Sequence, residues 1–497
     1  MQRKLMFIVA AVLVAWGSCL PATADETADS SVWLLKKCTL VHRNGRHNVL
    51  LRALRQMHDP KLKPLFSELV QKHHPVMQIH GVLGLAEIDP DKKIDLALVA
   101  DIKDSATQAQ LVSSAIESDL LTVEQAKQLI GWPGLTEPVK VIVAAYLTSK
   151  GQFTDAAILD ESLKSDNPAM VGMAAMLKMQ LGHSDAIRYL EELQQSNKPN
   201  RLQVQAMLMQ TAIRYEFDKI APWAMKLADD PEADRGLDLL ALRTAVHFGA
   251  KGGGSAWAKQ YAAATGAADR IRLAMLAVDL SDKLPPDLYD RLKKDSLPLI
   301  QQLGAVGQTI ASKQDPTDPI LKLLDQNNVL AGKWVMQYAN DQPIDKATPI
   351  LVGVILAAEG EPNPPQFRAQ RLENVVLATE MLSEKADNAA AIVHALLEKA
   401  SMLTQEAMVM GLIRSDADRP DKMIDGYDAW QSDTAASLAL LLRAKNTDKL
   451  TADQLDRLGL IVRGGAGLQE PLRVQAAWIY VKLTDQDKVT LASVLGK

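Results

Sequence analysis

Histidine and cysteine, the residue types that bind zinc, gather near the N-terminus of this chain. Six of the nine histidines precede residue 81, and they are His42, His47, His58, His73, His74 and His80. Cys38 and His42 are four residues apart and could share one face of a helix. A zinc site would need ligands from separate segments to converge, however, and no Cys-x-x-Cys pair is present to anchor them. We therefore expect surface or helix-end histidines here, and neither a metal ion nor another cofactor is predicted.

No familiar catalytic motif has the spacing that its chemistry requires. Gly252–Ala256 lack the closing glycine of a nucleophile elbow. Ala331–Trp334 lack both the glycine-rich lead and the hydroxyl of a phosphate-binding loop. Asp421–Gly426 contain acids only at their first and fifth positions, which does not fit a calcium-binding loop. No catalytic residue is predicted, although a pair of carboxylates of the glycosidase kind stays open because acids are numerous.

Residues 35–74 carry a strong positive charge. Their nine basic residues are Lys36, Lys37, Arg43, Arg46, Arg52, Arg55, Lys61, Lys63 and Lys72, against the two acids Asp59 and Glu68, which makes 9 − 2, or +7. Charged runs are usually solvated faces, here the exposed side of terminal helices. The alternative is a site for an anionic partner, such as lipid headgroups, a cell-wall polymer or an acidic protein. The candidate residues for that site are Lys36, Lys37, Arg43, Arg46, Arg52 and Arg55.

The first 24 residues resemble a secretory signal peptide. Two basic residues precede an apolar run, Leu5–Leu20, and Ala22–Ala24 have the small-x-small pattern of a cleavage site. Cleavage after Ala24 predicts a periplasmic or secreted protein. Lipidation at Cys19 is the alternative, but the bulky Trp16 fits that pattern poorly. N-terminal sequencing of the exported chain distinguishes the two.

Charge and apolar content limit the classes of partner. Removal of the signal peptide takes away two of the 55 basic residues, so the exported chain would carry 53 − 60, or −7. This negative balance argues against a nucleic-acid partner. No later apolar run approaches the roughly 20 residues that a membrane span needs. The strongest run, Ile350–Ala358, predicts a buried helix.

Prolines recur at a nearly regular interval through the middle of the chain. They lie at Pro75, Pro138, Pro168, Pro199 and Pro231, and the last three intervals are 30, 31 and 32 residues. Since proline cannot continue a helix, each would mark the seam between two helical hairpins. A period of about 31 residues predicts an all-α fold, a right-handed superhelix (α-solenoid) of stacked antiparallel helical hairpins.

Two groups of segments resemble known helical-repeat families. Pro75–Val99 resemble a HEAT repeat, with a proline at the start and an Asp-Pro turn between two helices. Gly151 with Thr154–Ala156, and Gly182 with Ser184–Ala186, look like the second half of a tetratricopeptide repeat. In these segments the glycine would end one helix in the left-handed conformation, and the hydroxyl would cap the next helix. The resemblance implies an α-solenoid protein of bacterial envelope type.

Shorter signals predict local structure. Thr122–Gln125 have the form of a capping box. Three six-residue segments with similar sequences begin at Trp223, Trp257 and Trp334. This similarity favours a core position for each tryptophan in successive hairpins over an aromatic binding stripe. Lys251–Ser255, with three glycines in a row, predicts a loose turn or hinge.

The chain is thus expected to contain a signal peptide (residues 1–24), basic capping helices (25–73), a helical-repeat solenoid (74–358) and C-terminal helical repeats or a bundle (367–497). We expect an exported, non-catalytic scaffold that holds a protein or an envelope polymer. The alternative is an envelope enzyme on a superhelical frame that degrades cell wall or polysaccharide. Its sites would stack sugars on aromatic rings, and 22 aromatic residues among 497 are few for that. A peripheral contact with an anionic membrane is a third hypothesis.

Overall fold

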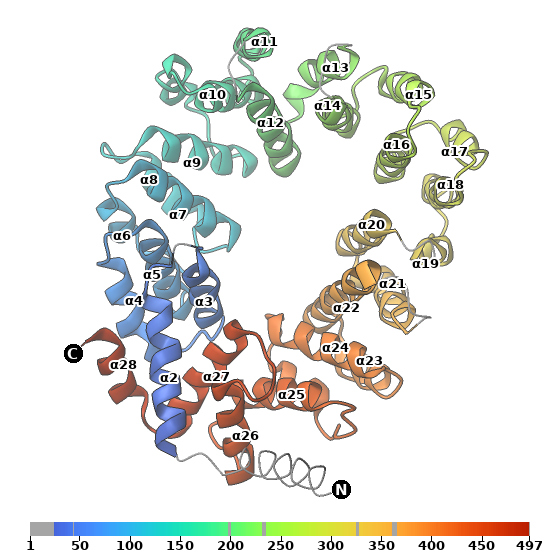
Figure 1. Ribbon diagram of the computed structural model, residues 1–497. Coiled ribbons are helices and arrows are strands. Elements are labelled where there is room, and N and C mark those ends of the chain that lie inside the picture. The colour runs from blue at the N-terminus through green and yellow to red at the C-terminus, as the bar shows by residue number, and fades with distance from the viewer. Residues whose placement is uncertain are drawn as a thin grey trace, which may run out of the picture. The chain divides into compact units, whose positions relative to one another are not determined.

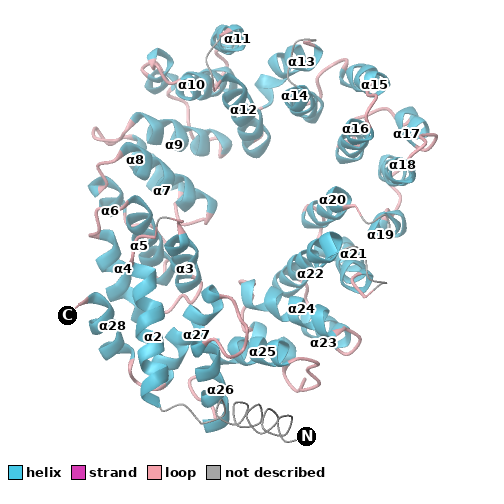
Figure 2. Ribbon diagram, in the orientation of Figure 1, coloured by secondary structure: helices cyan, strands magenta, loops and turns pink. Residues whose placement is uncertain are grey.

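The structure is a computed structural model that describes residues 24–42, 44–196, 200–230, 235–324, 328–359 and 365–496. Within these ranges the chain is helical apart from turns and connecting loops, and it contains no β-strand (Figure 2). The predicted all-α architecture is confirmed. Residues 1–23 of the predicted signal peptide, together with Arg43, Pro199 and Pro231, lie outside the described ranges. None of the described helices is both long enough and apolar enough to span a membrane.

Contacts between helices divide the chain into two compact units. Unit 1 combines Met1–Lys92 with Ser401–Lys497, and unit 2 is the segment between them in the sequence, Lys93–Ala400. The boundaries expected from the sequence, at residue 74 and between residues 358 and 367, rested on composition and on clustered prolines. No pattern in the sequence indicated that the first and last helices belong to one unit.

Unit 2 is a succession of helices that pack mainly on near neighbours in the chain (Figure 1). Its α-helices are α6 (Leu96–Asp101), α7 (Ser105–Glu117), α8 (Val123–Ile130), α9 (Glu137–Ser149), α10 (Pro168–Gln180), α11 (Ile187–Gln195), α12 (Arg201–Tyr215), α13 (Ala221–Asp229), α14 (Arg235–His247), α15 (Gly253–Ala263), α16 (Ala267–Asp279), α17 (Asp287–Leu292), α18 (Pro298–Ala311), α19 (Thr317–Leu324), α20 (Val329–Asn340), α21 (Ile344–Ala357), α22 (Pro365–Lys385) and α23 (Ala389–Leu397). Its 3-10 helices are η2 (Ala156–Leu159), η3 (Ser162–Lys164), η4 (Ser184–Ala186) and η5 (Asp218–Ile220). Such neighbour-to-neighbour packing is consistent with an α-solenoid, in which each hairpin buries its apolar face against the next.

Unit 1 joins the two ends of the chain in one core (Figure 1). Its helices are α2 (Ala24–Thr39), α3 (Arg46–Arg55), η1 (Pro60–Leu62), α4 (Lys63–Val70), α5 (Pro75–Ile88), α24 (Met402–Arg414), η6 (Pro420–Ile424), α25 (Asp433–Lys445), α26 (Ala452–Arg463), α27 (Glu470–Leu483) and α28 (Asp487–Leu495). Helix α27 contacts α2, α3, α25, α26 and α28. Its residues 474–481 are all buried, so α27 is the interior helix of the unit.

Three of the recurring prolines begin helices, which the sequence predicted for Pro75. Pro75, Pro138 and Pro168 lie in the first turns of α5, α9 and α10. A proline fits this position because the first N–H groups of a helix have no partner within it. His74 is the N-cap of α5 and Asp89 is its C-cap, so the first helix of the HEAT-like segment has the expected ends.

The predicted capping box at the start of α8 is confirmed. Thr122 Oγ1 accepts a hydrogen bond from the Gln125 N–H at 3.2 Å, and the Gln125 side-chain oxygen accepts one from the Thr122 N–H at 3.1 Å. Each side chain therefore satisfies a backbone donor of the other residue at a helix end.

The caps predicted in the two tetratricopeptide-like segments are wrong. Asp155, not Thr154, caps the segment after Gly151, and its carboxylate accepts from the Ala157 N–H at 3.2 Å. Ser184 lies inside η4 and makes no cap. The reason is that each glycine is followed by a 3-10 turn in place of the start of an α-helix. Both glycines do adopt the predicted left-handed conformation, with φ of 65° and 97°.

The repeated tryptophans are core residues. Trp223 in α13 and Trp257 in α15 are fully buried, and Trp334 in α20 is 7% exposed. Trp257 stacks on Tyr261 and Trp334 stacks on Tyr338, with ring centroids 4.9 Å and 5.2 Å apart. The three repeated tryptophans are therefore core residues, as predicted, and they do not form an exposed aromatic stripe for a ligand.

The turn or hinge predicted at Lys251–Ser255 is limited to a turn at Lys251 and Gly252, because α15 begins at Gly253. Gly252 is the N-cap, with φ of 91°, and Gly253 is the first residue of the helix. A Cβ atom on Gly253 would lie 2.5 Å from a methyl carbon of Val246. The glycine therefore allows α14 and α15 to approach closely.

A buried carboxylate ties the two ends of the chain together. Asp59 Oδ2 accepts a hydrogen bond from Trp478 Nε1 and pairs with Lys482, both at 3.1 Å. Its other oxygen accepts from the Lys61 N–H at 3.0 Å and so caps η1. Gln475 donates to a backbone carbonyl of α3 at 3.0 Å. These groups belong to segments about 420 residues apart in the sequence, so they join the two ends of the chain in unit 1.

We predict that Trp478→Ala destabilises unit 1 by about 3–5 kcal/mol, because it removes a fully buried indole and leaves Asp59 without one donor. Urea unfolding followed by hydrogen exchange of the α3 and α27 amides measures this. Leu460→Ala is the control, since Leu460 lies on the neighbouring α26 and is 48% exposed. Unchanged exchange in both helices of Trp478→Ala would contradict the central role of α27.

Candidate functional site on the N-terminal helices

The basic residues singled out in the sequence fall into two groups. Lys37, Arg46 and Arg55 form ion pairs with acids of unit 1. Lys36 and Arg52 are exposed and pair with no acid among the described residues. The first group contributes ion pairs to the fold, and Lys36 and Arg52 remain exposed to a partner.

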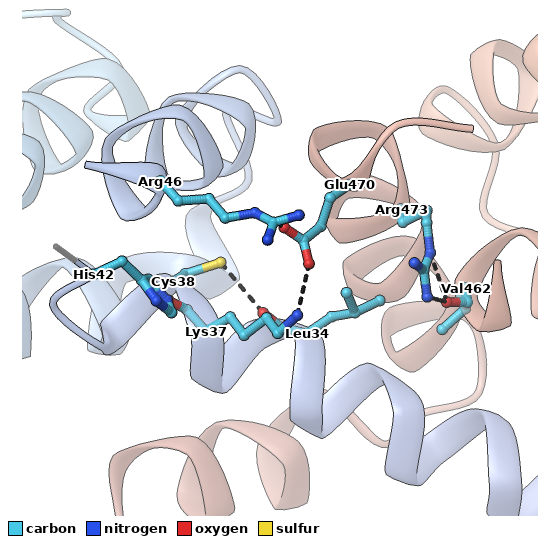
Figure 3. Close-up of polar contacts among 8 residues, drawn as sticks. All are labelled: Leu34, Lys37, Cys38, His42, Arg46, Val462, Glu470 and Arg473. Carbon is cyan, nitrogen blue, oxygen red and sulfur yellow. Dashed lines mark hydrogen bonds and ion pairs between the residues drawn. The ribbon is translucent and has the colours of Figure 1, made fainter. Parts of the chain in front are cut away.

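Glu470 forms ion pairs with two of these cations, Lys37 and Arg46 (Figure 3). It is the first residue of α27, and its side chain is 9% exposed. Lys37 Nζ lies 2.8 Å from one carboxylate oxygen, and Arg46 Nε lies 2.5 Å from the other. Burial acts to raise the pKa of the Glu470 carboxyl, but the hydrogen bond from Lys37 and the charges of Lys37, Arg46 and Arg473 outweigh it and lower the pKa. The carboxylate is therefore charged at neutral pH and holds α2 and α3 to α27.

Cys38 lies close to this ion pair (Figure 3) and is a structural residue. Its side chain is fully buried, and its Sγ lies 3.5 Å from the Leu34 carbonyl oxygen. Burial, followed by the negative charge of Glu470, raises the pKa of the thiol far above its usual range. A neutral, buried thiol is a poor nucleophile and a poor metal ligand.

Three of the N-terminal histidines lie together. The His47 ring lies 6.2 Å from that of His42 and meets that of His74 edge-on at 5.3 Å. His47 Nδ1 accepts a hydrogen bond from the His42 backbone N–H at 3.0 Å, which assigns the proton to the other ring nitrogen. Burial, then the neighbouring histidines, lowers the pKa of His47. Among the described residues, no group of three or more His, Cys, Asp or Glu side chains is arranged to hold a metal ion.

His80 is held neutral by its surroundings. Its ring is buried, Nε2 donates to Asn48 Oδ1 at 2.6 Å, and Nδ1 accepts from Arg55 at 3.3 Å. Arg55 also donates through Nε to Glu87 at 2.9 Å, which fixes the guanidinium beside the ring. Burial first, and then the nearby positive charges, lowers the pKa of His80 to about 3. The histidines of this region thus pack α3 against α5.

Exposed apolar side chains accompany the two unpaired cations. Trp33 and Lys36 are one helical turn apart on α2, and Val49 and Arg52 are one turn apart on α3. Helices α2 and α3 pack together. Four apolar side chains of this region are 52–58% exposed. With the two cations they form a set that we call the N-terminal surface, which consists of Trp33, Lys36, Leu40, Val41, Val49 and Arg52.

Unit 2 contains a groove between α20, α21 and α22, which we call the unit 2 groove. It encloses about 440 Å³ of space, including the part that opens to solvent. Its walls are mainly apolar, with Val329, Val354 and Phe367 among them. The side chains of Gln370 and Asn374, on α22, are among its polar groups.

These two amides give the unit 2 groove one donor and one acceptor. Gln370 Nε2 donates to Asn374 Oδ1 at 3.1 Å. Gln370 Oε1 and Asn374 Nδ2 have no partner among the described residues, although Asn374 is only 4% exposed. Gly332 makes room for this arrangement, since a Cβ atom there would lie 2.8 Å from Asn374 Nδ2. Apolar walls beside a free donor and a free acceptor match an extended peptide that carries an apolar side chain.

Sequence reasoning missed most of these groups. Trp33 was not among the candidates, although its place one turn before Lys36 and Lys37 was visible in the sequence. Gly332 was considered only as part of a failed phosphate-binding loop. No sequence pattern identified Gln370 and Asn374 as candidate binding residues, because their roles depend on which face of α22 is turned toward α20.

Comparisons of the chain with protein-family models, with curated proteins and with solved structures gave no match. Its function is therefore argued from its own residues.

We predict that His80→Gln removes part of the acid destabilisation of unit 1. The unfolded histidine binds a proton below its ordinary pKa of 6.5, whereas the folded one stays neutral down to about 3. The stability that depends on this histidine is thus complete above pH 6.5 and is lost as the pH falls toward 3, by about 1.4 kcal/mol per pH unit. Between pH 7 and pH 4.5, urea unfolding should show wild type losing roughly 3 kcal/mol more than the variant.

The control for this prediction is His73→Gln, which changes an exposed histidine just before α5. Its stability should follow the wild-type pH dependence. Parallel pH profiles of wild type and His80→Gln would show that burial of His80 does not couple folding to protons.

Proposed function

We propose that this protein is an exported, non-catalytic binding scaffold whose unit 2 groove holds an extended segment of a partner protein. The observation that carries the proposal is the free donor and acceptor pair of Gln370 and Asn374 between apolar walls. On this proposal the hairpins of unit 2 stack as a right-handed superhelix with about 31 residues per step, of mixed HEAT and tetratricopeptide character. Export to the periplasm or beyond follows from the predicted cleavage after Ala24.

The peptide would bind through its backbone and one side chain. Its N–H would donate to Gln370 Oε1, its carbonyl would accept from Asn374 Nδ2, and an apolar side chain would lie against Phe367 and Val354. Each neutral hydrogen bond contributes about 0.5–1.5 kcal/mol, so burial of the apolar side chain supplies most of the affinity and the amides fix the direction of the chain.

We predict that Gly332→Ala weakens peptide binding while it preserves the fold. The new methyl group would displace the Asn374 amide, and loss of one or two hydrogen bonds should reduce affinity about 3–30-fold. Stability should stay within about 1 kcal/mol of wild type, because alanine is the better helix former. Peptides selected from a displayed random library, measured by fluorescence anisotropy, provide the ligand.

Lys333→Ala is the matched control, since Lys333 is the next residue on α20 and is exposed. It should bind the selected peptides as wild type does. If no peptide is selected, or if Gly332→Ala binds with unchanged affinity, the unit 2 groove is not the binding site.

The N-terminal surface supports a second function, peripheral attachment to an anionic membrane. An exposed tryptophan and exposed aliphatic side chains beside lysine and arginine are typical of side chains that enter the headgroup region. Lys36 and Arg52 would supply the attraction, at about 1 kcal/mol each. Arg46 and Arg55, which the sequence also suggested, would contribute less because they are paired with Glu470 and Glu87.

We predict that Lys36→Glu combined with Arg52→Glu reduces binding to phosphatidylglycerol vesicles by at least about tenfold. Binding of wild type should fall as salt is added, and vesicles of neutral lipid should bind less protein. Lys251→Glu combined with Lys259→Glu gives the same charge change at exposed sites of unit 2 and should leave binding unaltered. Equal binding of the two double variants to phosphatidylglycerol vesicles would contradict the membrane proposal.

A further inference from the structure

Unit 1 contains a cavity between the end of α3, the end of α25 and the end of α27. It encloses about 440 Å³ of space, including the part open to solvent. Its apolar lining includes Met57, Ile479 and Leu483. Its polar lining includes Lys445 and His58. The N-terminal surface and the unit 2 groove involve none of these residues.

Lys445 is the group in this cavity that lacks a counter-ion. Its side chain is half-buried at the end of α25 and forms no ion pair with any described residue. Burial lowers the pKa of its ammonium group, and the charge of Asp416 opposes this shift. Burial of a cation without a partner costs free energy, which a bound anion would recover.

The other charged groups around the cavity are already engaged. Asp59 accepts from Trp478 and pairs with Lys482 within 3.1 Å. Glu87, which acts on His58 from a distance, is held by Arg55. Among the described residues no carboxylate forms an ion pair with Lys445, and the charge of Asp416 offsets only part of the effect of burial. His58 stands at the rim of the cavity, where its imidazole can donate a hydrogen bond to an anion.

We propose that this cavity binds a small organic carboxylate with a short apolar body. The carboxylate would pair with Lys445 and accept a hydrogen bond from His58, and the apolar body would lie against Met57, Ile479 and Leu483. One unpaired ammonium matches one negative charge, and the apolar lining favours such a ligand over an inorganic phosphate dianion.

Calorimetric titration with butanoate and hexanoate tests this proposal. Both should bind to the full chain with saturation, hexanoate more tightly, whereas hexanamide and inorganic phosphate should bind at least about tenfold more weakly, because a charge-assisted hydrogen bond contributes about 1.5–3 kcal/mol. Lys445→Met should bind both carboxylates at least about tenfold more weakly than wild type does. Lys449→Met, which changes an exposed lysine just after α25, should bind as wild type does.

A measurement without substitutions guards against a folding defect. Acylation of Lys445 by an amine-reactive reagent, followed by mass spectrometry, should slow at least severalfold when hexanoate saturates the protein, while acylation of Lys449 should not change. Failure of both carboxylates to bind, equal binding of hexanamide, or acylation of Lys445 that hexanoate does not slow would each overturn the proposal.

Discussion

The structure depends on the docking of helix α27 against α2 and α3. Glu470 receives Lys37 and Arg46 at one end of α27, and Trp478 donates to Asp59 further along. The interior residues 474–481 bury apolar surface on every side of the helix, which supplies most of the stabilisation. The ion pairs and the indole hydrogen bond fix register, because a shifted helix would leave buried charges unpaired. The two ends of the chain thereby become one core.

This docking divides the basic segment into two parts with different roles. Lys37, Arg46 and Arg55 neutralise acids of unit 1, and burial together with neighbouring positive charge lowers the pKa of His80 to about 3. Lys36 and Arg52 remain exposed beside Trp33 and Val49. A net charge counted along the sequence cannot separate these parts, because an ion pair within the fold and a free cation contribute equally to the count.

Unit 2 is built differently, since its helices pack mainly on near neighbours in the chain. In such a succession each helix turns one side toward the next hairpin and leaves other positions open. The groove at α20, α21 and α22 arises where Gly332 lets the α22 amides lie against α20. The two cavities thus differ in chemistry, since the unit 2 groove has the amides of Gln370 and Asn374 in its lining and the unit 1 cavity has Lys445, which forms no ion pair with a described residue.

The sequence by itself determined the helical class, the helix start at Pro75, the capping box at Thr122 and the core positions of the repeated tryptophans. These features depend on residues within about one helical turn or on the period of apolar positions, so local physics suffices. It did not determine the 3-10 turns after Gly151 and Gly182, the helix start within Lys251–Ser255, or the partners of Asp59, Glu470 and Lys445. Only the tertiary structure decided these, because they depend on which helices meet, and in unit 1 the helices that meet stand at opposite ends of the chain.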